Sequence, residues 1–401
     1  MKLVNQKLIK NTNLKRVYQY IHQEPGVSRA QLAKYTHLSK TTVSTLVDEL
    51  MSENFIIDTG VVDNCNVGRR PNSLHLKQDE HYVIVICWNE SEVVGQIVDI
   101  CGNCVAGGRL SVNTGDSYVS QSYQLFQEQL LSQISKERLL GVCIVVPAMI
   151  DPDNKEIYST TLHFQREEDT NLIKELSSTF RKYPLAILND TACTAYAEKV
   201  YANVQEKDFA FINFSRGIGA ALFIDNSILG KATASYTQLG HYSIDPKGKH
   251  CSCGNRGCLE VMIGEDSLLE RVKSIKNENT LKQMEQLSYR ALGEVAMYGN
   301  QTARKVIEQI ASDFSLALSN LVCLVHPKAI IIGGKGSDLG PVFLESIQES
   351  LKKIGFRKML DSIKIRYSIL DENACYYGAM KYFFDTYYDF TQDLRGQVFI
   401  G

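Results

Sequence analysis

The stretch GHYSIDPKGKHCSCGNRGCLE, residues 240–260, is the strongest local signal in the chain. It places His241, Cys251, Cys253 and Cys258 within a short span, and one imidazole with three thiolates supplies a closed tetrahedral set for Zn²⁺. Because no coordination position stays open for water, the ion is expected to staple a long loop and not to catalyse a reaction. The alternative interpretation is three free thiols beside an ordinary histidine.

On both sides of this stretch the pattern predicts two α/β lobes of the same plan. Short apolar runs separated by turn residues indicate a strand meander from Tyr82 onward, followed by helix, strand and helix, and a second meander restarts this order at Phe209. We therefore predict a duplicated βββαβα lobe with a ligand cleft between the copies. The predicted strands are 82–88, 92–100, 105–112, 141–146, 185–188, 209–214, 219–224, 227–232, 329–332 and 363–367, and the predicted helices are 171–180 and 191–201.

The N-terminal segment, residues 1–77, predicts a winged helix-turn-helix. A helix with buried positions from Leu14 to Ile21 precedes a short helix opened by a Ser28–Gln31 capping box, and Ser39 can cap a third helix. Two short strands around a hairpin then form the wing, and such a module enters the major groove with the start of its third helix. A protein–protein module is the alternative. The residues expected to contact DNA are Arg29, Lys40, Thr41, Thr42, Ser44 and Thr45 on the helices and Arg69 and Arg70 on the wing.

Charge is distributed unevenly along the chain of 401 residues, which has 43 Lys and Arg against 45 Asp and Glu. Residues 1–77 hold 11 basic and 6 acidic side chains, whereas the rest holds 32 and 39, so a basic head joins an acidic body. No apolar run reaches the roughly 18 residues of a membrane span, and no signal peptide is recognised. We expect a cytoplasmic protein without membrane association, in a compartment that keeps its 11 cysteines reduced.

Two further patterns have structural interpretations. Cys101-Gly102-Asn103-Cys104 is a CxxC sequence, but it falls at a predicted hairpin turn. The aromatic residues near the C-terminus have helical spacing and predict core or dimer packing in preference to a ligand platform; they are Tyr382, Phe383, Phe384, Tyr387, Tyr388 and Phe390.

Taken together, these motifs resemble the ROK family, which comprises sugar-responsive repressors and sugar kinases. The resemblance covers nearly the whole chain and is carried by Gly217-Ile218-Gly219-Ala220, the Gly240-His241 step, the CxCGxxGCLE signature at Cys251–Glu260, and Asn189-Asp190. It implies an actin- and hexokinase-like, ribonuclease H-like core of two lobes. The kinases lack a DNA-binding head, so this chain looks like the repressor branch, closest to xylose repressors and to the glucose and N-acetylglucosamine regulators.

The resemblance also implies a set of sugar-binding residues. In the family, sugar hydroxyls are held by an Asn-Asp pair, by Glu and His of an ExGH step, and by the Glu after the last Cys. The matching positions are Asn189, Asp190, Gln238, His241 and Glu260, with Gln238 standing where the first Glu is expected. Carboxylates and amides suit vicinal hydroxyls, and His241 could bind zinc through one nitrogen and a hydroxyl through the other.

Enzymatic activity is not expected. A ROK kinase carries an Asp followed by glycines and Thr after the first strand of the core, where this chain reads Cys87-Trp88-Asn89-Glu90-Ser91-Glu92. Bulky and acidic side chains replace the glycines whose N–H groups would approach phosphate. Asp190, the kinase general base by resemblance, then becomes a hydroxyl acceptor.

These observations predict a transcriptional repressor with a winged helix at 1–77 and a two-lobed sugar-binding domain at 78–401, whose zinc loop spans 241–258. It would bind operator DNA as a homodimer, or as a tetramer, and be released by a sugar or sugar phosphate. The alternatives are an ATP-dependent ROK sugar kinase, or a repressor controlled by a protein partner.

Overall fold

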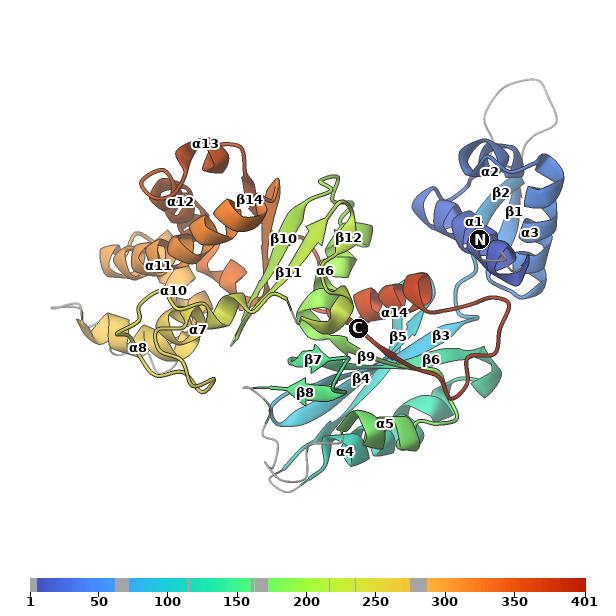
Figure 1. Ribbon diagram of the computed structural model, residues 1–401, viewed down its shortest axis with the longest axis horizontal. Coiled ribbons are helices and arrows are strands. Elements are labelled where there is room, and N and C mark those ends of the chain that lie inside the picture. The colour runs from blue at the N-terminus through green and yellow to red at the C-terminus, as the bar shows by residue number, and fades with distance from the viewer. Residues whose placement is uncertain are drawn as a thin grey trace. The chain divides into compact units, whose positions relative to one another are not determined.

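The computed structural model describes residues 6–61, 72–113, 116–159, 162, 172–215, 217–234, 236–274 and 287–401 (Figure 1). The chain divides into two compact units. Unit 1 comprises Met1–Val146, Gln165–Leu188 and Cys375–Ile400, and unit 2 comprises Pro147–Phe164, Asn189–Ala374 and Gly401. The chain therefore passes from one unit to the other several times.

The N-terminal part of unit 1 is a winged helix, as predicted. Its elements are α1 (Gln6–Gln23), α2 (Arg29–Thr36), α3 (Lys40–Ser52), and the antiparallel strands β1 (Ile56–Val61) and β2 (Asn72–Leu76). The Ser28 side chain accepts a hydrogen bond from the Gln31 backbone N–H, and Ser39 accepts one from that of Thr42, so both predicted helix caps are confirmed. The apolar stripes of α1 and α3 are buried, which holds the three helices together.

The remainder of unit 1 is built on a six-stranded sheet of order β15-β9-β6-β3-β4-β5. Strands β3, β4 and β5 form an antiparallel meander. On the other edge of β3 lies β6, which pairs with it in parallel, and β15 pairs in parallel with β9. Helices α4 and α5 lie on one face and α14 on the other (Figure 1). The bounds are β3 Tyr82–Trp88, β4 Glu92–Asp99, β5 Cys104–Ser111, α4 Tyr118–Leu125, β6 Leu139–Val146, α5 Leu172–Thr179, β9 Leu185–Asn189, α14 Ala374–Thr386 and β15 Val398–Ile400.

Unit 2 repeats this plan with a five-stranded sheet of order β12-β11-β10-β13-β14. Phe214 on one face of the sheet packs with Phe314 and Phe343, whereas Phe209 and Phe223 on the other face pack with α6. The bounds are β7 Met149–Asp151, β8 Glu156–Tyr158, α6 Asp190–Tyr201, β10 Phe209–Phe214, β11 Ile218–Ile224, β12 Ser227–Ile228, α7 Leu259–Ile263, α8 Glu265–Ser274, α10 Tyr289–Met297, α11 Gln301–Val325, β13 Ala329–Gly333, α12 Gly340–Leu351, α13 Arg357–Leu360 and β14 Lys364–Tyr367.

The predicted fold class is confirmed, because both sheets place a meander beside parallel strands in the same order. One predicted strand is wrong in its extent. Residues 227–232 were expected to be extended, but β12 ends at Ile228. Gly230 adopts φ 73°, which turns the chain into a short 3₁₀ helix at Lys231–Thr233.

No helix among the described residues is both long enough and apolar enough to cross a bilayer.

Candidate functional site

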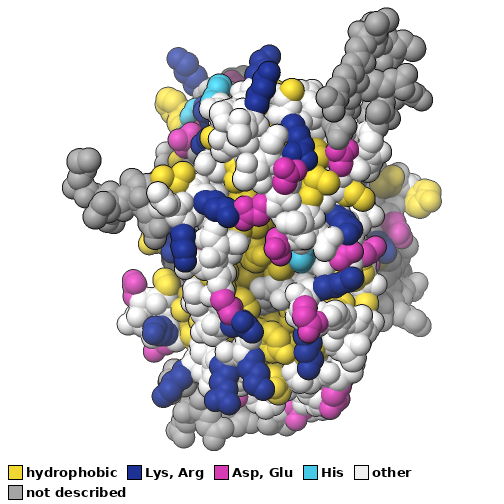
Figure 2. Space-filling model, turned by 90° about the vertical axis from the view of Figure 1, so that its right-hand side faces the viewer, with side chains coloured by type: hydrophobic (Ala, Val, Ile, Leu, Met, Phe, Trp, Pro, Cys, Tyr) yellow, Lys and Arg dark blue, Asp and Glu magenta, His cyan; other side chains and the backbone are white. Residues whose placement is uncertain are grey.

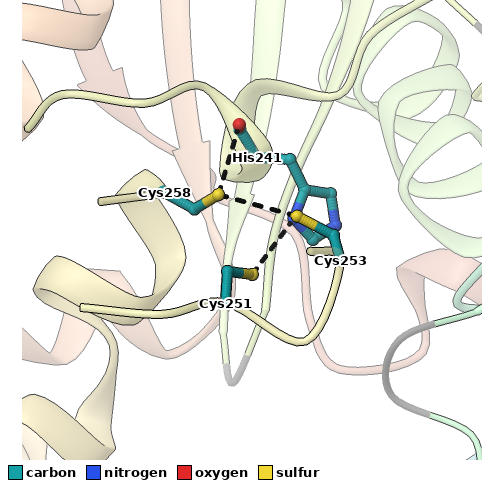
Figure 3. A group of neighbouring side chains, drawn as sticks. All are labelled: His241, Cys251, Cys253 and Cys258. Carbon is teal, nitrogen blue, oxygen red and sulfur yellow. Dashed lines mark hydrogen bonds between the residues drawn. The ribbon is translucent and has the colours of Figure 1, made fainter. Parts of the chain in front are cut away.

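The four predicted metal ligands converge in unit 2 (Figure 3). A 3₁₀ turn at Leu239–His241 presents the imidazole, and Cys258 precedes α7. The ligand atoms of His241, Cys251, Cys253 and Cys258 all lie within 4.8 Å of one another. Within the described parts of the chain, they form the one cluster of at least three His, Cys, Asp or Glu residues that could hold a metal ion.

The spacing of these atoms fits a tetrahedral ion. Zinc–sulfur bonds of about 2.3 Å at tetrahedral angles separate two sulfurs by about 3.8 Å. Here the Sγ atoms of Cys253 and Cys258 are 3.7 Å apart, and Cys251 Sγ is 3.7 Å from His241 Nδ1. Burial and, after it, the neighbouring thiols together raise the pKa of Cys258 to about 12, so three thiolates would need a cation to coexist here.

A tight backbone approach fixes the histidine side of this cluster. A Cβ atom at Gly240 would lie 2.3 Å from the carbonyl oxygen of Ile218, so only glycine lets the turn pass β11 this closely. The next residue, His241, then directs Nδ1 toward the thiols. Its backbone carbonyl accepts a hydrogen bond from Cys258 Sγ at 3.4 Å.

Glu260 links the cluster to the predicted sugar-binding residues. Its Oε1 lies 3.3 Å from His241 Nδ1 and 3.5 Å from Cys251 Sγ. Its Oε2 lies 3.5 Å from the position that a Cβ atom at Gly217 would take and 3.3 Å from that of a Cβ at Gly240. One carboxylate therefore touches the metal ligands and also lies near the turn at Gly217.

The Asn189-Asp190 pair lies where β9 becomes α6. Asn189 is buried and caps α6, because its Oδ1 accepts from the Ala192 N–H at 2.9 Å while its Nδ2 donates to the Ala148 carbonyl at 3.0 Å. Asp190 Oδ1 accepts hydrogen bonds from Asn189 Nδ2 at 3.1 Å and from the Thr191 hydroxyl at 3.3 Å. The helix-cap role thus belongs to Asn189.

Asp190 is a predicted sugar-binding residue whose pKa is shifted by its surroundings. Burial raises the pKa of Asp190 to about 6, and the hydrogen bonds from Thr191 and Asn189 oppose that rise. Its side chain keeps some exposure to solvent. A carboxylate that is partly desolvated and still reachable gains more from a hydroxyl donor than a fully hydrated one does.

The structure brings some of the predicted sugar-binding residues together and leaves another apart. His241 and Glu260 are in contact, and so are Asn189 and Asp190. The exposed side chain of Gln238 instead donates from Nε2 to the Ala234 carbonyl at 2.9 Å. Sequence reasoning missed Thr191, whose hydroxyl contacts Asp190 and lies 2.3 Å from where a Cβ of Gly219 would stand; its place directly after the Asn-Asp pair was the available signal.

The start of α3 presents the predicted DNA-contacting residues. Lys40, Thr41, Thr42 and Thr45 are exposed and Ser44 is half-buried. Arg29 behaves differently, because it pairs with Asp48 at 2.7 Å and donates to the Ser44 carbonyl at 3.2 Å. Arg69 and Arg70 lie outside the described residues. On the side of the molecule drawn in Figure 2, the described Lys and Arg side chains alternate with acidic ones.

The winged helix packs on α14 through the C-terminal aromatic cluster, so the expected core packing of those residues is confirmed. The rings of Tyr18 in α1 and Phe384 in α14 are 4.4 Å apart, and Phe55 contacts Phe384, Tyr388 and Phe390. Tyr18 also donates from its hydroxyl to the carbonyl of Ile100, in the hairpin turn that contains the CxxC sequence. The winged helix therefore packs against both α14 and the turn that follows β4.

Charged groups are enclosed in the same interface. Lys381 Nζ lies 2.6 Å from Asp385 Oδ1 and 5.4 Å from the centre of the Tyr18 ring, and Lys15 Nζ donates to the Asp385 carbonyl at 2.9 Å. Burial and, after it, the charge of Lys381 together lower the pKa of His22 to about 4. Lys381 and Asp385 are one helical turn apart, but no sequence pattern indicated the contact between Lys15 and Asp385, which are 370 positions apart.

Comparison with known proteins agrees with this geometry. The profile of the ROK family matches residues 123–385, and that of a winged helix-turn-helix DNA-binding module matches residues 10–57. The chain is 25% identical to the xylose repressor of Bacillus subtilis over 97% of its own length and 99% of the relative's. It is 24% identical to the transcriptional repressor Mlc of Escherichia coli over 86% of each chain.

Solved structures show the same fold. A ROK-family transcriptional regulator homologous to Escherichia coli Mlc superposes with a TM-score of 0.77 at 23% identity, covering 93% of this chain and 96% of the other. A ROK glucokinase from Streptomyces griseus superposes with a TM-score of 0.61 at 19% identity and covers 74% of this chain and 97% of its own. At these identities the likeness concerns the fold alone.

Proposed function

The chain belongs to the ROK family, and on that premise we propose that it is a cytoplasmic transcriptional repressor that releases operator DNA when a sugar or sugar phosphate binds. The observation that carries the proposal is the span of the similarity. Two relatives named xylose repressor match over 94–97% of this chain and 96–99% of their own length, so the similarity includes both the winged helix and the ROK core.

Operator binding is assigned to the winged helix. The exposed start of α3 supplies Lys40, Thr41, Thr42, Ser44 and Thr45 to the major groove, with the wing arginines Arg69 and Arg70 on the backbone or minor groove. Arg29 has a structural partner in Asp48, so it contacts phosphate only if that ion pair opens. Two half-sites then require a homodimer, or a tetramer built from two of them.

Effector binding is assigned to Asn189, Asp190, Gln238, His241 and Glu260, all within unit 2. The Asp190 and Glu260 carboxylates accept hydrogen bonds from sugar hydroxyls. Gln238 can join this set only by giving up its bond to Ala234. Xylose is the first effector to test, because relatives are named for it.

The His–Cys₃ cluster is assigned to a structural Zn²⁺. His241, Cys251, Cys253 and Cys258 would hold the ion, and their spacing supports a closed tetrahedral site. When bound, the ion supplies cross-linking of the 241–258 loop and no reaction. Because Nδ1 of His241 faces the thiols, Nε2 is the nitrogen left for a sugar hydroxyl.

Loss of kinase activity is part of the proposal, and the turn after β3 supports it. Trp88 is buried, donates from Nε1 to the Ser122 hydroxyl at 2.8 Å and stacks on Tyr118. The Tyr118 hydroxyl in turn binds the carbonyls of Asn89 and Glu90. This packing supports the proposal, because a kinase needs a glycine-rich turn here whose backbone N–H groups can approach phosphate.

The test is operator binding in the presence of sugars. Duplexes selected from a random pool by the purified protein would be labelled and followed by fluorescence anisotropy, with xylose, glucose, N-acetylglucosamine and their phosphates added. We expect at least one sugar to weaken binding about 5–150-fold, and Asp190→Ala to bind DNA normally without responding. Selection of no duplex would refute DNA binding. Release of DNA by none of the sugars would favour a protein partner, and sugar-dependent ADP formation at kinase rates would favour the enzyme.

A further inference from the structure

Two cysteines outside the metal cluster lie in direct contact. Cys87, near the end of β3, and Cys375, in the first turn of α14, place their Sγ atoms 3.9 Å apart. They are 288 residues apart in sequence, so nothing but the fold brings them together. Cys87 is buried, whereas Cys375 is partly exposed.

Two thiols in contact can serve as metal ligands or as a dithiol that forms a disulfide. A structural metal site needs about four protein ligands, and the described residues contain no third His, Cys, Asp or Glu placed to complete a cluster here. A disulfide needs its sulfurs about 2.05 Å apart, so sulfurs at 3.9 Å must approach by roughly 1.9 Å. The geometry therefore favours redox chemistry over metal binding.

The surroundings suit a thiol that must ionise in order to react. The Tyr376 hydroxyl forms a hydrogen bond with the Cys87 side chain. Burial raises the pKa of Tyr376, so the phenol keeps its proton and can donate it to the sulfur while that sulfur carries negative charge. Partial exposure of Cys375 lets a small oxidant reach it first.

We propose that Cys87 and Cys375 are a peroxide-sensitive thiol pair that closes reversibly to a disulfide and ties the start of α14 to β3. The Cys375 thiolate attacks a peroxide oxygen, the O–O bond breaks, and sulfenic acid and water result. The Cys87 thiolate then attacks the Cys375 sulfur, the S–O bond breaks, and a second water leaves as the S–S bond forms. Two thiols lose two electrons and two protons, one hydrogen peroxide becomes two waters, and a dithiol reductant reverses the change.

The position of the pair gives the bond a consequence. The chain enters unit 1 from unit 2 between Ala374 and Cys375, and α14 then runs to the winged helix, which it meets at Phe384. A disulfide at the first turn would restrain this helix at the end nearest the crossing. We expect it to reduce the effect of sugar on operator affinity, an expectation that rests on the proposed function.

The pair itself is tested without any reference to DNA. The full-length, zinc-loaded protein would be treated with hydrogen peroxide, alkylated, digested and mapped by mass spectrometry. A peptide linking Cys87 to Cys375 that disappears with dithiothreitol is expected in the wild type and in Cys323→Ser, which removes an exposed thiol of unit 2. It should be absent from Cys375→Ser, whose folding is checked by the fluorescence of the buried Trp88.

The outcomes are separable. Alkylation of both Cys87 and Cys375 at peroxide levels that oxidise Cys323 would overturn the proposal, as would irreversible oxidation of Cys375 without a link. In the anisotropy assay, the sugar effect should fall toward one-fold on oxidation and return with dithiothreitol, whereas Cys375→Ser keeps it. An oxidised wild type with a full sugar response would refute the regulatory consequence. A reduced protein whose operator affinity changes with none of the sugars would count against the proposed function. The presence or absence of the linked peptide would still test the proposed disulfide between Cys87 and Cys375.

Discussion

Replacing Asp385 by Asn should destabilise unit 1 strongly, because it leaves a buried cation without its partner. The side chain of Lys381 is 3% exposed and that of Asp385 is 10% exposed, with 2.6 Å between the charged atoms. Lys15 approaches the same residue, since its Nζ donates to the Asp385 carbonyl. Removing one member of a buried ion pair costs about 3–5 kcal/mol, and Asp385→Asn should lower the free energy of unfolding by that amount.

Urea denaturation followed by tryptophan fluorescence measures this change directly. The chain has one tryptophan, and Trp88 is buried in the sheet of unit 1, so its emission reports on that unit. The charge-free pair Lys381→Met with Asp385→Asn should recover most of the loss, because an apolar replacement of a buried ion pair is often neutral. Asp393→Asn, which removes the acid of an exposed pair with Arg395, is the matched control and should leave the midpoint unchanged.

The result that would refute this reasoning is a small effect of the single change. A loss below about 1 kcal/mol is typical of a solvent-screened pair, and it would mean that water reaches Lys381. A double variant no more stable than Asp385→Asn would show that the damage is steric and not electrostatic. Either result would remove the argument that the winged helix and α14 enclose charge between them.

Three other outcomes are expected. Purified protein should contain one zinc per chain, and Cys253→Ser should lose the metal and unfold at lower urea; full metal content by elemental analysis would contradict the assignment. Burial raises the pKa of Asp190 to about 6, so its stabilising contribution is present below about pH 4 and is lost as pH rises through 6. Asp190→Asn should therefore flatten the pH dependence of the free energy of unfolding, measured by urea titration between pH 4 and 7. Replacing Arg69 and Arg70 by Ala should lower the salt slope of operator binding by roughly one unit per lost phosphate contact, and an unchanged slope would place the wing outside the complex.

Local signals in the sequence were sufficient for much of the fold. The caps at Ser28 and Ser39 were predictable because they depend on residues two or three positions apart. The meanders were predictable because alternating and continuous apolar runs report burial directly. The four metal ligands were also predictable, because residue type and short spacing define such a site.

Long-range pairing was not predictable from those signals. Strand β15 pairs with β9 in parallel, with Val398 opposite Leu185, and nothing in either short sequence indicates which strand it pairs with. The same holds for the contact between Tyr18 and Phe384, because helical spacing predicted that both rings are buried but not that they pack against each other. Gln238 shows a subtler limit, because a motif gives its position in the chain but not that its amide turns back to Ala234.

The division of the chain constrains how a sugar could act on DNA. Under the proposed function, every residue assigned to the sugar belongs to unit 2 and the winged helix belongs to unit 1, and the segments that join the units are one route for the response. Two of these are placed to carry it: β9 of unit 1 continues directly into Asn189 and Asp190, and unit 2 continues at Ala374 into α14, which contacts α1 through Phe384. A ligand that binds Asp190 acts at the first segment, whereas the winged helix packs against α14 in the second. Since a ligand shifts an equilibrium only by its differential affinity for the two states, a sugar that releases DNA has to bind the DNA-incompetent state more tightly, and we expect these two segments to differ between the states.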